Sequence, residues 1–296
     1  QPNHKGITMK NINVFAAELP TITTLEESLN NAEGLLFTPL TDNQWSNLGL
    51  SANNQLTDLG NGYRIDFIYA GKDIPKPQIK EELEKLISNM DYEPSKDEVG
   101  QLCESVTAEF CAKMIIKTVK FSAYYHTKKQ SLVFDCKDSL AQSALSLLIK
   151  ALGSVETKTL HCSNISNSLT SNMLEQLNAG NDLVKFAGFE TGDLLVLANA
   201  EKDVVRFKGD YPTEQVSELL FDGYEVKQLN LSKDGVSFTI NNEFKIKGIK
   251  TSFDIETGEF MDEEDFKIHL QALELEIVTS HCDDLRNFFD KQNDEV

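Results

Sequence analysis

Hydrophobic and polar positions follow two different rhythms along the chain. Apolar residues recur at helical spacing from Ile79 to Met90. After Pro94, Ser95 and Glu98 have the spacing of a capping box, and an apolar pattern continues from Val99 toward Val119, which predicts a second helix. The two helices are expected to form a hairpin that projects from a sheet.

β-Branched and aromatic residues dominate after this pair, which is typical of strands. The runs 121–125 and 132–136 flank residues 126–130, so we expect a β-hairpin with Lys128 and Lys129 at its tip. The remaining strands are expected at 10–19, 63–70, 193–198, 204–208, 224–231, 236–240, 244–253 and 273–279, and the remaining helices at 23–32, 138–153, before Gly180, from Thr213 and at 283–290.

Strict alternation of strands and helices is missing, which favours an α+β fold with mixed sheets over a doubly wound one. We expect residues 1–8 to be added residues or a short tail before Met9. An N-terminal α+β region (9–76), a helical hairpin with a basic finger (77–134) and a central and C-terminal α+β region (135–296) follow.

The charge balance is acidic, with 28 Lys and Arg against 47 Asp and Glu among 296 residues and a formal net charge of −19. Net charge alone would not suggest a nucleic-acid binder. Residues 110–134, however, contain five lysines and no carboxylate. Chance clustering or a solvated lysine face would also produce such a window.

Lys113, Lys117 and Lys120 would share one face if the helix continues to this point. Together with Lys128, Lys129 and nearby aromatics they would suit a surface that follows phosphates. A second acid-free window contains Lys245, Lys247 and Lys250, and strand alternation puts the first two on one face. Only three arginines are present, so little sequence preference is expected.

Enzyme motifs are poorly represented, and no cofactor is expected. Glycine-rich phosphate loops and the nucleophile elbow are absent from the sequence. The five cysteines form no CxxC pair, and residues 262–265 are expected to charge the first turn of a helix rather than bind metal. Asp234 with Glu243 and Lys245 has the form of a magnesium nuclease site, but the same spacing recurs by chance elsewhere.

The longest apolar runs, such as 194–198, are far shorter than a membrane span, and no signal peptide is recognisable. We therefore expect a soluble protein of the cytoplasm.

Short motifs follow one another in a characteristic order from about Met9 to Phe289: Lys10-Asn11, Phe37-Thr38-Pro39, Leu56-Thr57, Asn61-Gly62, Pro75-x-Pro77-x-Ile79-Lys80, Lys96-Asp97-Glu98-Val99, Asp135-Cys136, Leu152-Gly153-Ser154, Leu169-Thr170, Val204-Val205-Arg206, 226–231 and Glu264-Asp265-Phe266. In their order and spacing these motifs resemble the RdgC family of bacterial recombination-associated proteins.

This resemblance implies a ring-shaped homodimer whose basic hole takes double- and single-stranded DNA without sequence preference. It also implies a nucleoid-associated, non-enzymatic protein that restrains RecA-promoted recombination by competing for DNA. Arg206 and Lys208 join the candidate DNA-binding residues on this basis. The chain departs from the family in having aliphatic side chains at 114–116, and Gly209 and Asp210 after Lys208.

Two alternatives stay open at this point. An acidic protein could mimic DNA and capture a recombinase or nuclease, or the chain could be a magnesium-dependent nuclease.

Overall fold

The computed structural model describes residues 9–52, 56–153, 157–159, 165–180, 185–186, 188–209, 211–251 and 262–294. The α+β prediction is confirmed, because the described chain combines helices with one large antiparallel sheet. The strands run in the order β10-β9-β11-β12-β13-β1-β6-β5-β4-β2, with β3, β7 and β8 pairing beside this path. The expected division of the chain into regions at residues 76 and 134 stays a prediction.

The strands are β1 (Asn11–Ala17), β2 (Ser46–Leu50), β3 (Leu56–Asp58), β4 (Gly62–Lys72), β5 (Ile116–His126), β6 (Ser131–Asp135), β7 (Thr157–Thr159), β8 (Lys185–Phe186), β9 (Phe189–Ala198), β10 (Val204–Lys208), β11 (Glu225–Lys233), β12 (Val236–Asn241) and β13 (Ile246–Thr251). The helices are α1 (Ile22–Asn30), α2 (Lys76–Ser88), α3 (Lys96–Lys113), α4 (Asp138–Leu152), α5 (Ile165–Asn178), α6 (Thr213–Phe221) and α7 (Glu263–Asp294), with a 3-10 turn at Glu33–Leu35.

Two hydrophobic cores support the two ends of the sheet. In the N-terminal core, β1, β4, β5 and β6 pack against α1 and α4, and the rings of Phe67 and Phe121 stack with centroids 5.4 Å apart. In the C-terminal core, β9, β11, β12 and β13 pack against α5, α6 and α7, where Phe189 and Phe289 are fully buried. Burial of these apolar faces stabilises each end of the sheet.

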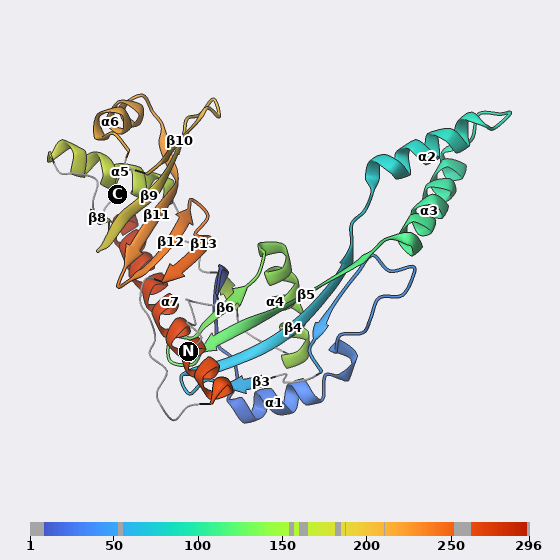
Figure 1. Ribbon diagram of the computed structural model, residues 1–296, viewed down its shortest axis with the longest axis horizontal. Coiled ribbons are helices and arrows are strands. Elements are labelled where there is room, and N and C mark those ends of the chain that lie inside the picture. Colours follow the sequence, from blue (N-terminus) through green and yellow to red (C-terminus); the bar gives the residue numbers. More distant parts are fainter. Residues whose placement is uncertain are drawn as a thin grey trace.

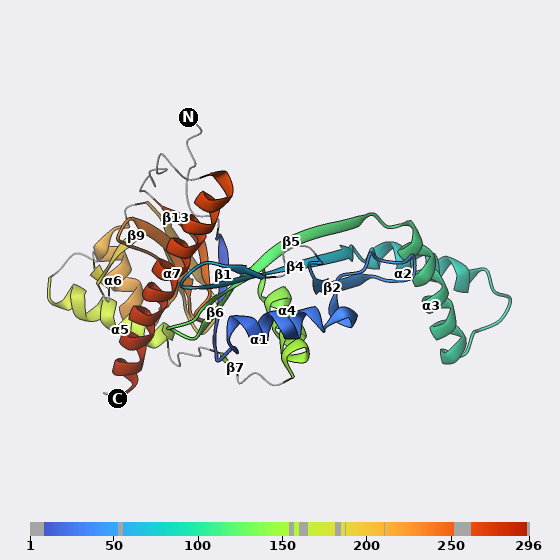
Figure 2. The same ribbon diagram turned by 90° about the horizontal axis from the view of Figure 1, so that it is seen from below.

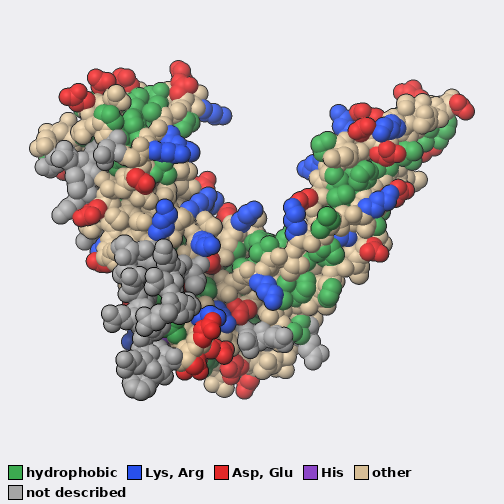
Figure 3. All heavy atoms as spheres, viewed as in Figure 1, with side chains coloured by type: hydrophobic (Ala, Val, Ile, Leu, Met, Phe, Trp, Pro, Cys, Tyr) green, Lys and Arg blue, Asp and Glu red, His purple; other side chains and the backbone are tan. Residues whose placement is uncertain are grey.

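The two halves of the chain diverge as two arms (Figure 1), and the space-filling view shows an open hollow between them (Figure 3). The C-terminal strands with α5 and α6 form one arm, and the helical hairpin α2–α3 forms the other at the end of the long β4–β5 ribbon. Helix α1 lies on the outer side of the ribbon in Figure 1, and α1 and α4 lie beside the ribbon in Figure 2. Their side chains form one core with Phe67 and Phe121, so this face of the ribbon is turned away from the hollow. The opposite face of the ribbon is therefore the floor of the hollow.

The projecting helical hairpin is confirmed, including its capping box. The Ser95 hydroxyl accepts the Glu98 N–H, while the Glu98 carboxylate accepts the Ser95 N–H at 2.8 Å. The predicted end of this helix was wrong, because α3 stops at Lys113 and β5 begins at Ile116. β-Branched side chains at 115–119 and an unbroken ladder to β4 favour the strand there.

The predicted hairpin at 121–136 is confirmed as β5 and β6, whereas the predicted strand 273–279 is wrong. That segment lies inside α7, which also absorbs the short helix expected at 283–290. Buried residues recur three or four positions apart along α7: Phe266, Leu270, Glu274, Val278, Cys282, Leu285 and Phe289. Over the whole length of α7 this helical spacing outweighs the strand-like alternation of residues 273–279.

The acidic residues at the start of α7 charge its first turn, as predicted. Glu263, Glu264 and Asp265 occupy the first turn, and the Asp262 carboxylate accepts the N–H groups of Glu264 and Asp265. Negative charge at this end is stabilised by the helix dipole.

Candidate nucleic-acid interface

Two lysines of β13 reach the same surface because a glycine interrupts the strand. Gly248 has a φ of 64°, and both its N–H and that of Ile249 point to the Lys10 carbonyl. This bulge adds one residue, so that Lys247 and Lys250 are both exposed while Ile246 and Ile249 are both buried. Simple alternation would have put the two lysines on opposite faces.

Arg206 and Lys208 of β10 lie on the same face of the sheet as these lysines. Arg206 is opposite Val196, Val196 is opposite Gln228, and Gln228 is opposite Asn241. Residues directly opposite each other in antiparallel strands share a face. Asn241 and Thr239 alternate along β12, and Thr239 is opposite Lys247, which completes the row.

The face that carries these four cations is polar. Between β10 and β13 it presents mainly amide and hydroxyl side chains: Gln228, Asn230, Ser232, Ser237, Thr239 and Asn241. The carboxylate of Glu190, opposite Ser232, lies on the same face. The helices α5, α6 and α7 cover the opposite, apolar face. Four strand spacings of about 4.8 Å separate β10 from β13, so the face is about 19 Å wide. We call the surface formed by Arg206, Lys208, Lys247 and Lys250 the polar sheet face.

Lys and Arg side chains line the inner side of the curve in the space-filling view (Figure 3). They gather over the C-terminal strands and along the approach to the helical hairpin, while acidic side chains are concentrated below the hollow and toward the arm ends. The distribution of charge, rather than its total, therefore favours an anion inside the hollow.

The predicted helical lysine face does not exist. Lys113 is the last residue of α3, where a cation suits the helix dipole, and it lies 3.9 Å from Glu109. Lys117 and Lys120 belong to β5, and their spacing of three puts them on opposite faces of the strand. Lys117 forms an ion pair with Asp73.

Lys120 is the member of this group that faces the hollow. It alternates with Ser122 and Tyr124, and Tyr124 packs into the C-terminal core, whereas Phe121 and Ala123 pack toward α1 and α4. Lys120 is exposed.

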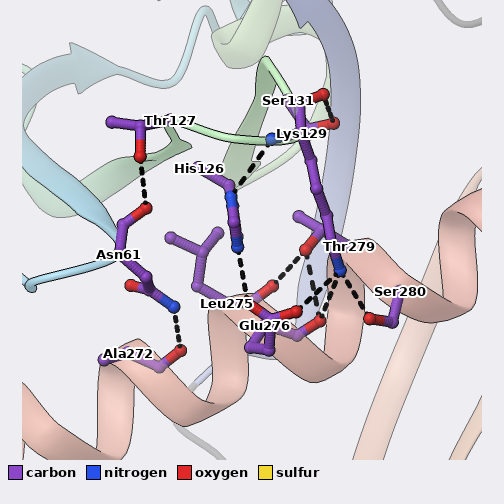
Figure 4. Close-up of polar contacts among 10 residues, drawn as sticks. All are labelled: Asn61, His126, Thr127, Lys129, Ser131, Ala272, Leu275, Glu276, Thr279 and Ser280. Carbon is purple, nitrogen blue, oxygen red and sulfur yellow. Dashed lines mark hydrogen bonds and ion pairs between the residues drawn. The ribbon is translucent and has the colours of Figure 1, made fainter.

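Lys128 and Lys129 sit at the hairpin tip as predicted, but only Lys128 is exposed. The Lys129 ammonium lies 3.0 Å from a Glu276 carboxylate oxygen and donates to the Glu276 carbonyl and the Ser280 hydroxyl (Figure 4). Its charge is already partnered, so Lys129 holds the hairpin against α7 rather than serving an external phosphate.

Sequence reasoning missed the network around this lysine. His126 is almost completely buried and bonds to Glu276 at 2.6 Å, with its Nδ1 accepting the Lys129 N–H (Figure 4). Hydrogen bonds from His126 and Lys129 lower the Glu276 pKa to about 2. Asn61 adds a bond to the Ala272 carbonyl. The partners are 150 residues apart, which no local pattern indicates.

Lys245 is also less available than predicted. It precedes β13, and its ammonium lies 2.6 Å from Glu243 and 3.2 Å from Asp138. Hydrogen bonds to these carboxylates, first to Glu243, raise the pKa of Lys245. The ammonium is therefore charged but locally neutralised.

The nuclease alternative loses its proposed acid pair. Asp234 lies in the turn before β12 and Glu243 in the turn after it, so the six residues of β12 hold them about 20 Å apart. Within the described ranges, no group of three His, Cys, Asp or Glu side chains is arranged to hold a metal ion. Likewise, none of the helices there is long and apolar enough to cross a membrane.

A curved antiparallel sheet with a projecting helical hairpin and cations along its inner side defines an α+β protein suited to holding an extended anion. The family model described as "Putative exonuclease, RdgC" matches residues 7–290, nearly the whole chain. The chain belongs to the RdgC family. The search of curated proteins found no match.

Proposed function

We propose that this protein binds double- and single-stranded DNA without sequence preference in its hollow, in a recombination-associated role. The observation that carries the proposal is the polar sheet face, where Arg206, Lys208, Lys247 and Lys250 flank mainly uncharged hydrogen-bonding side chains and outnumber the carboxylate of Glu190 on the same face. Lysine and arginine bind phosphates through charge, and amides and hydroxyls add contacts to the backbone. Lys120 and Lys128 extend this surface.

The proposed assembly is a homodimer whose two hollows face each other and encircle the DNA. In that arrangement the acidic exterior would repel DNA, and the inner cations would attract it into the hollow. A protein that covers DNA in this way restrains RecA by competing for the same substrate, in the nucleoid of the cytoplasm.

Salt-dependent DNA binding tests this function. Four substitutions to Gln at Arg206, Lys208, Lys247 and Lys250 should weaken binding to unrelated duplexes alike and reduce the slope of log K against log salt by about three to four. The matched control changes Lys76, Lys80, Lys85 and Lys96, all exposed on the helical hairpin, to Gln. Equal effects of the two variants, or none from either, would contradict the proposed DNA path.

Light scattering tests the assembly separately. A homodimer has about twice the 33.2 kDa mass of the chain, and a strict monomer at micromolar concentration would exclude encirclement.

A further inference from the structure

The outer half of β5 is an open edge of the sheet. β6 pairs with β5 only from Ala123 to His126, whereas β4 pairs with β5 along its whole length. Residues 116–120 are all exposed, with Ile116 and Val119 each 45% accessible. No other strand among the described residues pairs with this segment on its outer side. An open edge of this kind is a template for pairing with another strand.

The direction of the main-chain groups along this edge follows from the neighbouring strands. The Lys72 N–H donates to the Trp45 carbonyl, and the Asp66 carbonyl accepts the Ser51 N–H, so these residues of β4 direct their main-chain groups toward β2. Their partners on β5 are Ile116 and Ser122. Antiparallel pairs alternate between bonded and non-bonded, so Ile116, Thr118 and Lys120 point their N–H and C=O groups outward.

The side chains on this edge restrict how it can pair with itself. Only every second residue of this segment points its main-chain N–H and C=O groups outward. In an antiparallel pairing of two copies about a two-fold axis, such residues meet each other only if the axis passes through a residue rather than between two residues. Centring it on Lys117 or Lys120 would bring identical lysines face to face, which is unfavourable. Centring it on Thr118 puts Lys117 opposite Val119 and Lys120 opposite Ile116 of the second copy, without like charges in opposition.

The edge lies away from the hollow. Figure 2 shows β5 along the border of the ribbon, with β4 and then β2 on its other side, and nothing described covers that border. Pairing there would leave the polar sheet face and the ends of both arms free. It is therefore a different contact from the meeting of arm ends that closes a ring.

We infer that the β5 edge, Ile116 to Lys120, pairs antiparallel with the same edge of a second copy about a two-fold axis at Thr118. The pairing forms about six main-chain hydrogen bonds and continues the sheet across two chains. The lysines disfavour the registers centred on Lys117 and Lys120. Of the remaining registers, the one centred on Thr118 pairs all three outward-pointing residues, Ile116, Thr118 and Lys120, with one another. The contact joins copies side by side and does not require DNA.

Mixed disulfide formation tests both the contact and its register. Lys117 and Val119 of the second copy would form a non-bonded pair with Cα atoms about 4.5 Å apart, within reach of a disulfide. Lys117→Cys and Val119→Cys proteins should therefore cross-link to each other in a mixture under mild oxidation, while neither cross-links with itself above the wild-type background. Cross-linking of either variant alone, or no cross-link in the mixture, would overturn the inference.

A proline at the axis tests the hydrogen bonds. Thr118→Pro removes an outward N–H while leaving the inward bonds to β4, and Thr118→Ser keeps that N–H. In the wild type, amide exchange at Ile116, Thr118 and Lys120 should slow as protein concentration rises, whereas Thr118→Pro should abolish this slowing at the other two positions. Exchange independent of concentration would contradict the pairing. DNA binding measured on the same variants should be retained, so failure here is distinguishable from failure of the proposed function.

Discussion

His126 donates its Nε2–H to a Glu276 carboxylate oxygen at 2.6 Å, and this bond joins the β5–β6 hairpin to α7. The Nδ1 atom accepts a main-chain N–H, which places the imidazole proton on Nε2. Because α7 also packs in the C-terminal core, the bond connects the two halves around the hollow.

Glu276→Gln should lower the free energy of unfolding at pH 7 by about 1 kcal/mol. This is less than the loss expected for a fully buried charged hydrogen bond, because the Glu276 carboxylate is half exposed and solvent screens its charge. The Glu276 pKa is depressed to about 2 from its ordinary 4.5, so the folded state favours the ionised form. The stabilisation is complete above about pH 5 and is lost as pH falls through 4.5 toward 2. Denaturant unfolding across this range should show the two proteins converging at low pH. A difference that is constant with pH would contradict the role of the charge.

Lys129 and Lys128 are neighbours with separate predicted roles. Lys129→Met should lower the free energy of unfolding by about 1 to 2 kcal/mol, because Glu276 and Ser280 lose their partner. Lys128→Met should change stability by less than about 0.5 kcal/mol because its side chain is exposed. Thermal unfolding measures both. In DNA titrations only Lys128→Met is expected to reduce the salt slope, and the reverse pattern would refute the assignment.

Replacing Gly248 by a residue with a side chain should destabilise the bulge in β13. Gly248→Ala should destabilise the protein by about 1 to 2 kcal/mol, because the φ of 64° is unfavourable for an L-residue even though open space surrounds the position. Gly248→Asn should cost less, since asparagine tolerates this conformation. Chemical denaturation of both variants provides the comparison, and an Ala variant as stable as the wild type would show that the bulge is not required.

Asp234→Ala and Glu243→Ala should leave any magnesium-dependent DNA degradation by the purified protein unchanged. The two carboxylates stand at opposite ends of β12 and cannot share a metal ion. A nuclease assay with labelled single- and double-stranded substrates tests this. Loss of a magnesium-dependent activity in either variant would establish an enzymatic site that the separated carboxylates do not predict.

Much of the fold could be predicted from local sequence. The capping box at Ser95, the hairpin between β5 and β6 and the acidic first turn of α7 depend on residues within a few positions of one another. Local spacing is sufficient for such elements because their hydrogen bonds close over short distances.

The candidate site depended on tertiary structure. Residues 114–119 fit a helix or a strand by pattern, and pairing with β4 decided for the strand, which separated Lys117 from Lys120. The bulge at Gly248 brought Lys250 beside Lys247, and partners on α7 and α4 occupied Lys129 and Lys245.

The sequence by itself determined the α+β class, the helical hairpin and the supply of lysines in acid-free windows. Only the tertiary structure decided which lysines face the hollow and which are neutralised. The physical reason is that strand register and ion pairing join residues far apart in the chain, and one residue of slip in a strand moves a side chain to the other face.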